Sequence, residues 1–212
     1  MAVIVFNTGF ESGEPTGSLS GTATVQSVVV NSGSNALLTT ANSVGGNMTR
    51  IKIYPTDVAY LKITFNYRIG VLPNTTDNIL GVLKNSNTQQ NTLSLSSLGV
   101  LTANDDEGGT FSGSLALNTD QWYEIVFEYD ARNESGKRVA TLYVDDSSVA
   151  TCTNGLFSSA NQILLGEDIT ENGVLTGTFY FDNISTEMLV STPSNYQKYL
   201  KVGNMSRSEG AK

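Results

Sequence analysis

The chain has 212 residues and a net charge of −8, a length that suits one large β-domain as well as two small ones. Its 12 Lys and Arg are scattered among 20 Asp and Glu, so the concentrated basic face that nucleic-acid binding requires is missing. It contains no histidine, which excludes histidine-based catalytic triads and the usual zinc sites.

Cysteine usage and hydropathy bear on the cellular compartment of the protein and on membrane insertion. The single cysteine, Cys152, cannot form an intrachain disulfide, and its strand-like surroundings indicate a buried structural thiol. The N-terminal residues show no basic segment followed by an apolar one, which predicts synthesis in the cytoplasm without a secretory signal. No apolar run approaches the length of a membrane span, so we expect no membrane insertion.

Apolar and polar residues alternate with a period of two along most of the chain, which predicts β-strands with one buried face. Clusters of Gly, Pro, Asn and Asp separate these runs and predict turns. No run shows a convincing helical period. In chain order, the predicted strands are residues 3–6, 22–30, 36–40, 48–54, 59–69, 78–83, 91–95, 98–103, 110–117, 122–130, 138–144, 149–153, 162–166 and 177–185.

Residues 122–149 show the pattern best. In the first run Ile125 and Phe127 share one face, whereas Glu124 and Glu128 share the other. The polar residues 131–137 that follow include Asn and Gly, which tolerate a positive φ, so the two flanking runs should fold back as an antiparallel hairpin. A second tight turn is expected at residues 145–147.

So many short strands at regular spacing predict an all-β, antiparallel two-sheet sandwich over residues 1–190. From Ser191 onward the chain is polar and poorly patterned. Such a segment is mobile unless a partner holds it. We interpret residues 191–212 as a C-terminal extension that docks on a partner chain.

Three runs resemble the closing half of the concanavalin A-like, laminin-G-like jelly rolls. They are Trp-Tyr-Glu-Ile-Val-Phe-Glu-Tyr-Asp, Val-Ala-Thr-Leu-Tyr-Val-Asp-Asp and Thr-Phe-Tyr-Phe-Asp-Asn-Ile, and together they carry about a third of the chain. The resemblance implies a jelly-roll sandwich. It does not choose a function, because this superfamily includes lectins, glycan-binding modules, glucanases, adhesion domains and virion proteins.

The opening Phe-Asn-Thr-Gly-Phe-Glu-Ser-Gly and the closing Phe-Tyr-Phe-Asp-Asn-Ile resemble the ends of related carbohydrate-binding jelly rolls. The resemblance implies that, as in those modules, an acid near the start of the chain and an acid in the last strand help to hold a structural Ca²⁺. Carried over, the ligands would be Glu11 and Asp182, with backbone carbonyls completing the shell. In the alternative interpretation no cofactor binds, Asp182 caps a β-bulge and Glu11 is a solvated turn acid.

The sequence does not predict catalysis. Jelly-roll glucanases, as the resemblance implies, carry Glu-x-Asp-x-Glu on one strand so that all three acids enter one cleft. The nearest match is Glu167-Asp168-Ile169-Thr170-Glu171, where Asp168 falls one residue early and would point to the opposite face. We therefore expect no catalytic residues and no enzyme.

Glycan binding remains open. Glycan sites combine an exposed aromatic ring with hydrogen-bonding side chains, because a sugar has an apolar face and a polar edge. Tyr143 and Tyr180 alternate with apolar neighbours and so face away from the core, which makes them candidates. Trp122 is a third, although a Trp at a strand start more often covers the edge of a core.

Two functional interpretations follow. The first is a structural or interaction protein of a viral particle, such as a bacteriophage capsid decoration protein or a fibre or spike subunit, made in the host cytoplasm and located in the virion. It is based on the missing signal and catalytic groups and on the acidic, turn-rich composition. It predicts protein partners in a large assembly and a homo-oligomer. The alternative is a carbohydrate-binding module or lectin, which Ca²⁺ could stabilise.

Overall fold

The computed structural model describes residues 2–11, 18–19, 23–40, 48–52, 58–83, 89–132, 138–166 and 176–189. The C-terminal extension predicted at 191–212, the hairpin loop at 133–137 and the acidic run at 167–171 all lie outside these residues.

The described part of the chain is built of β-strands and contains no helix that could span a membrane. Its strands are β1 (Ala2–Thr8), β2 (Ser18–Leu19), β3 (Thr24–Gln26), β4 (Ala36–Thr40), β5 (Met48–Lys52), β6 (Tyr60–Val71), β7 (Asp77–Leu83), β8 (Gln89–Leu95), β9 (Val100–Asp105), β10 (Leu115–Ala116), β11 (Trp122–Asp130), β12 (Arg138–Val144), β13 (Ser147–Gly155), β14 (Gln162–Gly166) and β15 (Thr178–Leu189).

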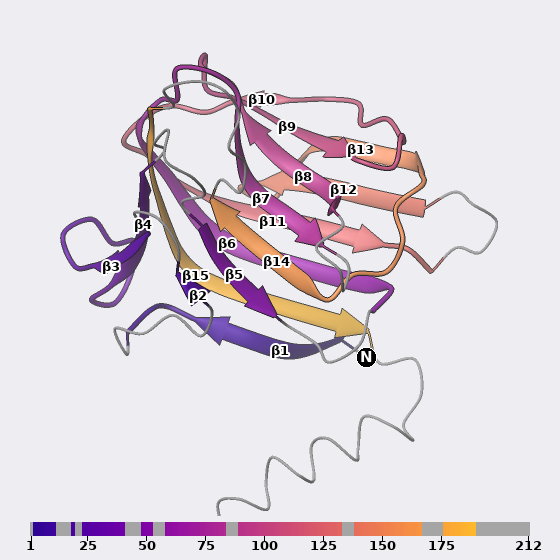
Figure 1. The fold of residues 1–212 in the computed structure, drawn as a ribbon, viewed down its shortest axis with the longest axis horizontal. Coiled ribbons are helices and arrows are strands. Elements are labelled where there is room, and N and C mark those ends of the chain that lie inside the picture. The colour runs from indigo at the N-terminus through magenta and orange to yellow at the C-terminus, as the bar shows by residue number, and fades with distance from the viewer. Residues whose placement is uncertain are drawn as a thin grey trace, which may run out of the picture.

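The strands form two antiparallel sheets that pack face to face (Figure 1). The larger sheet has the order β13-β12-β11-β6-β15-β4-β3, with β1 also paired to β15. The smaller sheet has the order β10-β9-β8-β7-β14-β5-β2. Several neighbouring strands, such as β6 and β15, are distant in sequence. The predicted all-β, two-sheet jelly-roll sandwich is confirmed.

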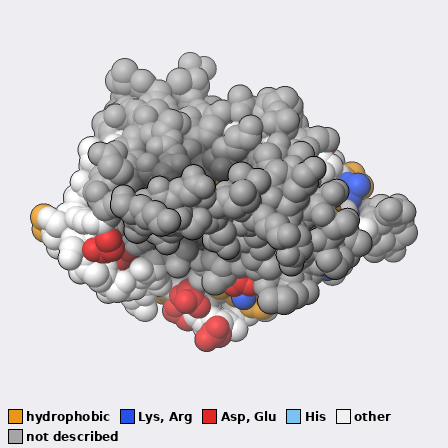
Figure 2. All heavy atoms as spheres, turned by 90° about the horizontal axis from the view of Figure 1, so that it is seen from below, with side chains coloured by type: hydrophobic (Ala, Val, Ile, Leu, Met, Phe, Trp, Pro, Cys, Tyr) orange, Lys and Arg blue, Asp and Glu red, His pale blue; other side chains and the backbone are white. Residues whose placement is uncertain are grey.

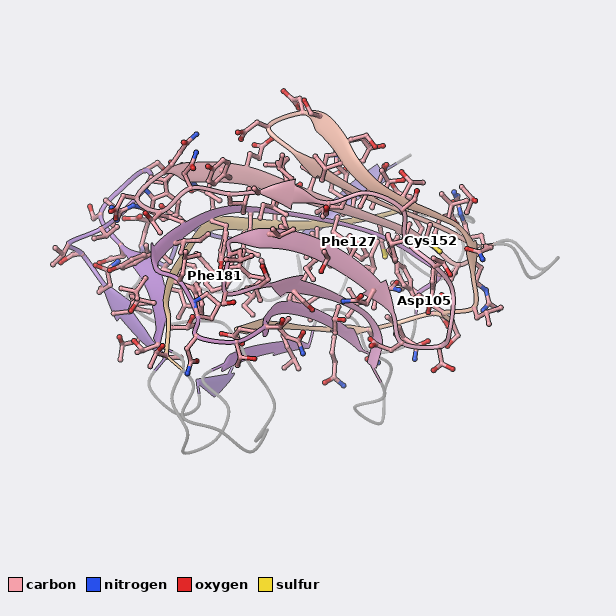
Figure 3. The ribbon with its side chains drawn as sticks, turned by 90° about the horizontal axis from the view of Figure 1, so that it is seen from above. Asp105, Phe127, Cys152 and Phe181 are labelled. Carbon is pink, nitrogen blue, oxygen red and sulfur yellow. The ribbon has the colours of Figure 1, made fainter. Side chains whose placement is uncertain are left out.

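The core lies between the sheets and follows the alternation in the sequence. In the larger sheet the inward-facing residues are Leu61, Ile63, Phe65, Tyr67, Ile69, Tyr123, Ile125, Phe127, Tyr129, Ala140, Leu142 and Val144, all buried. The smaller sheet supplies Leu80, Val82, Leu93, Leu95, Leu101, Ile163 and Leu165. Phe127, Phe181 and Cys152 lie between the two layers (Figure 3).

The predicted hairpin is confirmed. β11 pairs with β12 from Ile125 opposite Val144 to Asp130 opposite Val139. The second turn joins β12 to β13 through Asp145 and Asp146, whose φ angles are 47° and 64°. Two successive positive φ angles are typical of a type I′ turn, which matches the twist of antiparallel strands.

β15 carries a bulge that changes its partner strand. Residues Thr178–Phe181 pair with β4, whereas Ile184 to Leu189 pair with β1. Between these two segments the register against β6 shifts after Asp182, and Asn183 has a φ of 49°. The bulge therefore lies between the end of β1 and the start of β4.

Two predicted strands are shorter than the alternation suggested. Of the run 22–30, the described residues 23–30 form a strand only over Thr24–Gln26, because the Gln26 side chain accepts hydrogen bonds from the amides of Val28 and Val29 and turns the chain. The run 110–117 forms a strand only over Leu115–Ala116, after Gly113 at a φ of 103°. In both places local turn geometry overrides the apolar pattern.

Candidate functional site

The five residues singled out in the sequence fall into two places. Glu11 and Asp182 lie at the bulge of β15, whereas Trp122, Tyr143 and Tyr180 lie on the outer face of the larger sheet, the face turned away from the core. Each of these three aromatic residues alternates with buried neighbours and is itself half-buried.

At the bulge, both carboxylates bind the loop that joins β3 to β4. Asp182 is fully buried, and its Oδ2 accepts hydrogen bonds from the amides of Asn31 (2.9 Å) and Ser32 (3.0 Å). Its Oδ1 accepts one from Asn183 (2.7 Å). The Glu11 carboxylate accepts one from the amide of Ser34, at 3.0 Å to Oε1 and 2.9 Å to Oε2. The structure therefore brings the two predicted ligands to one loop.

This arrangement fits backbone capping better than a calcium shell. Calcium takes six to eight oxygen ligands, whereas the groups that face these carboxylates are N–H donors, which repel a cation. Asp182 accepts hydrogen bonds from three amides, and Glu11 accepts from the amides of Ser34 and Asn35, so most of their lone-pair positions are already used. Among the described residues no three acids or cysteines gather at one point. In this arrangement the groups around the two carboxylates do not fit a Ca²⁺ ion. Binding of the ion stays an untested prediction.

On the outer face of the larger sheet, Trp122, Arg68 and Tyr180 form one row across three adjacent strands. Trp122 of β11 lies opposite Arg68 of β6, and Arg68 lies opposite Tyr180 of β15. Directly opposite residues project to the same face of a sheet. We call these three residues the aromatic row; their order places a cation between two rings.

Arg68 is fixed by contacts on two sides. Its guanidinium carbon lies 5.5 Å from the centroid of the Tyr180 ring, within cation–π range. Its Nη2 donates to Asp120 Oδ1 at 2.7 Å. The Tyr180 ring also lies over Gly70, where a Cβ atom would come within 2.9 Å of Tyr180 Cε2. The absence of a side chain at Gly70 thus allows the ring to lie close to the sheet.

Two adjoining hollows lie at the other end of β6 and β11. One, of about 210 Å³, is lined by Lys62, Val126, Glu128, Tyr143 and Asp146. The other, of about 340 Å³, is lined by Tyr60, Glu128, Tyr129, Asp130, Val139 and Thr141. Glu128 lines both, so we call the pair the Glu128 hollows.

Glu128 is held by two tyrosines. The Tyr60 hydroxyl donates to Glu128 Oε1 at 2.8 Å, and the Tyr143 hydroxyl donates to Oε2 at 3.4 Å. Burial, followed by the hydrogen bond to Glu128, raises the pKa of Tyr60, so its phenol remains a protonated donor. The Arg132 guanidinium lies 5.1 Å from the Tyr60 ring centroid, and its Nε donates to Asp130 Oδ1 at 2.8 Å. This bond lowers the pKa of Asp130, which stays ionised.

Arg68, Tyr60 and Glu128 were missed in the sequence. Alternation shows that each faces outward, but only the register of β11 against β6 and β12 shows which outward residues are neighbours. Without that register, an arginine or glutamate on a wet face looks like any other solvated charge.

The outer face of the smaller sheet offers a weaker candidate. There the Ser94 hydroxyl donates to Asn78 Oδ1 at 2.6 Å, and Asn104 Nδ2 donates to Ser94 Oγ at 3.2 Å. These polar groups bind one another, and Ser94 is buried. The larger sheet therefore presents the better-exposed combination of rings and polar groups among the described residues.

Comparisons with known proteins show the fold. No family model and no curated protein sequence matches the chain. Among solved structures, "Cellulose induced protein, Cip1" matches 88% of this chain and 97% of its own, with a TM-score of 0.65 and 16% identity. Alginate lyase AlgAT5 of polysaccharide lyase family 7 matches 73% of this chain and 79% of its own, with a TM-score of 0.53 and 12% identity.

A third match is the CBM22-1 xylan-binding domain of Xyn10C from Paenibacillus barcinonensis. It covers 90% of this chain and 97% of its own, with a TM-score of 0.50 and 11% identity. At such identities these likenesses establish a shared jelly-roll sandwich. Because they include both a lyase and a binding domain, the expectation that this chain is not an enzyme stays a prediction.

These matches overturn the first functional interpretation. Their names refer to cellulose, alginate and xylan, and none links the fold of this chain to a bacteriophage or a capsid. The virion interpretation was based on an acidic, turn-rich β-composition. That composition belongs to any two-sheet sandwich with two solvated outer faces, so it carried no information about a particle.

Proposed function

We propose that this protein is a carbohydrate-binding module that holds a glycan against the outer face of its larger sheet. The aromatic row carries the proposal. Trp122 and Tyr180 are half-buried and lie on one sheet face with Arg68 between them in register, and the planar guanidinium of Arg68 lies over the Tyr180 ring. Rings of this kind offer flat apolar surfaces to sugar rings, and Arg68 offers donors to sugar hydroxyls.

The rigidity of the row supports this role. The row is formed by the strands β11, β6 and β15; Arg68 and Tyr180 are paired with neighbouring strands on both sides, and Trp122 is paired with β6. Beneath them lies the packed core, including Phe65, Tyr67 and Phe181 with ring centroids 5.2 to 6.4 Å apart. A site on rigid strands loses little conformational entropy when a ligand binds. The fold shared with a xylan-binding domain is consistent with the proposal.

The test is a binding screen against immobilised polysaccharides, including cellulose, xylan, mannan and alginate, followed by titration calorimetry. Trp122→Ala and Tyr180→Ala should each weaken binding at least about tenfold, which corresponds to 1.4 kcal/mol. The matched control is Leu98→Ala, since Leu98 is 80% exposed in the turn between β8 and β9 of the other sheet.

Two further variants test the geometry of the row. Arg68→Lys keeps the charge but loses the planar group, and we expect it to weaken binding. Gly70→Ala should weaken binding by displacing the Tyr180 ring, whose Cε2 lies 2.9 Å from the position of the added Cβ atom. Circular dichroism and the melting temperature check that each variant is folded. The proposal would be overturned if none of the immobilised polysaccharides retained the protein. It would also be overturned if Trp122→Ala and Tyr180→Ala both bound with wild-type affinity.

A further inference from the structure

We infer that the glycan is a linear, uncharged chain that lies along β6 and β11 and contacts the Glu128 hollows as well as the aromatic row. This inference rests on the proposed function and deepens it. Its basis is that the two places occupy opposite ends of the same pair of strands. Arg68 lies opposite Trp122 at one end, and Lys62 lies opposite Glu128 at the other.

The distance between the two places exceeds one sugar ring. Arg68 and Lys62 are six positions apart on β6, as are Trp122 and Glu128 on β11. At about 3.3 Å per residue, the two ends are about 20 Å apart. A receptor for a single terminal sugar would need only one of them, so the arrangement favours several consecutive units of an extended chain.

The Glu128 hollows provide the second subsite. The carboxylate of Glu128 holds a tyrosine hydroxyl at each oxygen, so acceptor and donors are fixed before a ligand arrives. A sugar hydroxyl can replace either tyrosine hydroxyl at Glu128, while the Tyr60 and Tyr143 rings supply apolar surface. Concave sites with a few fixed polar groups are the usual form of small-ligand subsites.

The surface between the two ends carries no aromatic residue. Its outward residues are Thr64 and Asn66 on β6, with Val126 and Glu124 opposite them on β11. Thr64, Asn66 and Val126 are half-buried, whereas Glu124 is exposed. They carry no aromatic ring that would block a chain passing from the aromatic row to the Glu128 hollows.

The charge of this face selects an uncharged ligand. Its cations already have anionic neighbours: Arg68 pairs with Asp120, Arg132 pairs with Asp130, and Lys62 lies in register between Glu128 and Glu187. Glu124 adds a further exposed carboxylate. Figure 2 shows clusters of acidic side chains along the lower margin of the described surface. An acidic polysaccharide would meet repulsion here, whereas a neutral one would not.

The experiment is a calorimetric length series with xylan, cellulose and mannan oligosaccharides of two to six units, with alginate oligosaccharides as the charged comparison. For the sugar type that binds, affinity should rise at least about tenfold from two units to six. Alginate of equal length should bind at least about tenfold more weakly. Equal affinity at all lengths, or tighter binding of alginate, would overturn the inference.

The Glu128→Gln variant distinguishes the contribution of the Glu128 hollows to binding from that of the aromatic row. It should weaken binding of six-unit chains about fivefold or more while changing two-unit binding less than twofold, because short chains need only the aromatic row. Glu107→Gln, at an exposed loop after β9, is the matched control. Wild-type affinity of Glu128→Gln for six-unit chains would overturn the inference but leave the proposed function intact. Loss of all polysaccharide binding by the wild-type protein would instead mean that the proposed function has failed.

Discussion

The carboxylates of Glu11 and Asp182 bind the same loop, at positions only two residues apart. Asp182 accepts hydrogen bonds from the amides of Asn31 and Ser32, and Glu11 accepts one from the amide of Ser34. The loop therefore ties the segment after β1 to the bulge of β15, at the point where β15 changes partner from β4 to β1.

Loss of the Asp182 carboxylate should destabilise the protein more than loss of the Glu11 carboxylate. Asp182→Ala leaves three amides without their acceptor in a buried site and should lower the free energy of unfolding by about 3 kcal/mol. Glu11 is exposed, and Glu11→Ala should cost about 1 kcal/mol. Urea unfolding measures both. Equal costs would contradict the assignment of Asp182 as the main anchor.

Calcium should have little effect on stability. Because amide N–H groups face both carboxylates, we expect the melting temperature to be the same within error in excess Ca²⁺ and in EDTA. Differential scanning calorimetry measures this. A rise in melting temperature with Ca²⁺ that disappears in Glu11→Gln would instead show that the loop rearranges to place carbonyl oxygens around the ion.

The two faces of β11 should differ sharply in their sensitivity to substitution. Ile125 and Phe127 are fully buried, so Ile125→Ala or Phe127→Ala should each lower the free energy of unfolding by about 3 kcal/mol or more. Glu124→Ala, on the exposed face of the same strand, should change it by less than about 0.5 kcal/mol. A cost below about 0.5 kcal/mol at both apolar positions would mean that the two faces are inverted.

Asp77 should make stability fall as pH rises. Burial raises its pKa from 3.8 to about 7, and its Oδ1 has no hydrogen-bond partner among the described residues. Between about pH 4 and pH 7 the folded protein keeps a proton that the unfolded chain releases, so the free energy of unfolding decreases across this window and stays low above it.

Asp77→Asn should remove this dependence, because the amide cannot ionise. At pH 8 the variant should be more stable than the wild type by about 4 kcal/mol, because the wild type must ionise a buried carboxyl whose pKa is raised from 3.8 to about 7. At pH 4 the two should differ little. Chemical unfolding of both proteins across the pH range measures the difference, and parallel curves would contradict the raised pKa.

Cys152 should be unreactive in the folded protein. It is fully buried, and burial raises the pKa of its thiol, so little thiolate forms at neutral pH. A thiol reagent such as DTNB should label it only when the protein is unfolded in urea. Rapid labelling under native conditions would show that the strand β13 opens locally.

The sequence by itself determined most of the strands, their buried faces and the hairpin of β11 and β12. It could do so because a period of two and the turn residues are local properties of a chain, readable at Ile125 and Phe127 or at Asp145. It also placed Trp122 and Tyr180 on candidate strands, since each alternates with apolar neighbours.

Only the tertiary structure decided which of these strands are neighbours. The pairing of β6 with both β11 and β15 joins Trp122, Arg68 and Tyr180, residues from three distant parts of the chain. Likewise, only the folded chain brings Glu11 and Asp182 to one loop and sets two tyrosines on Glu128. The physical reason is that strand order and register are fixed by long-range packing, which no local pattern in the sequence encodes.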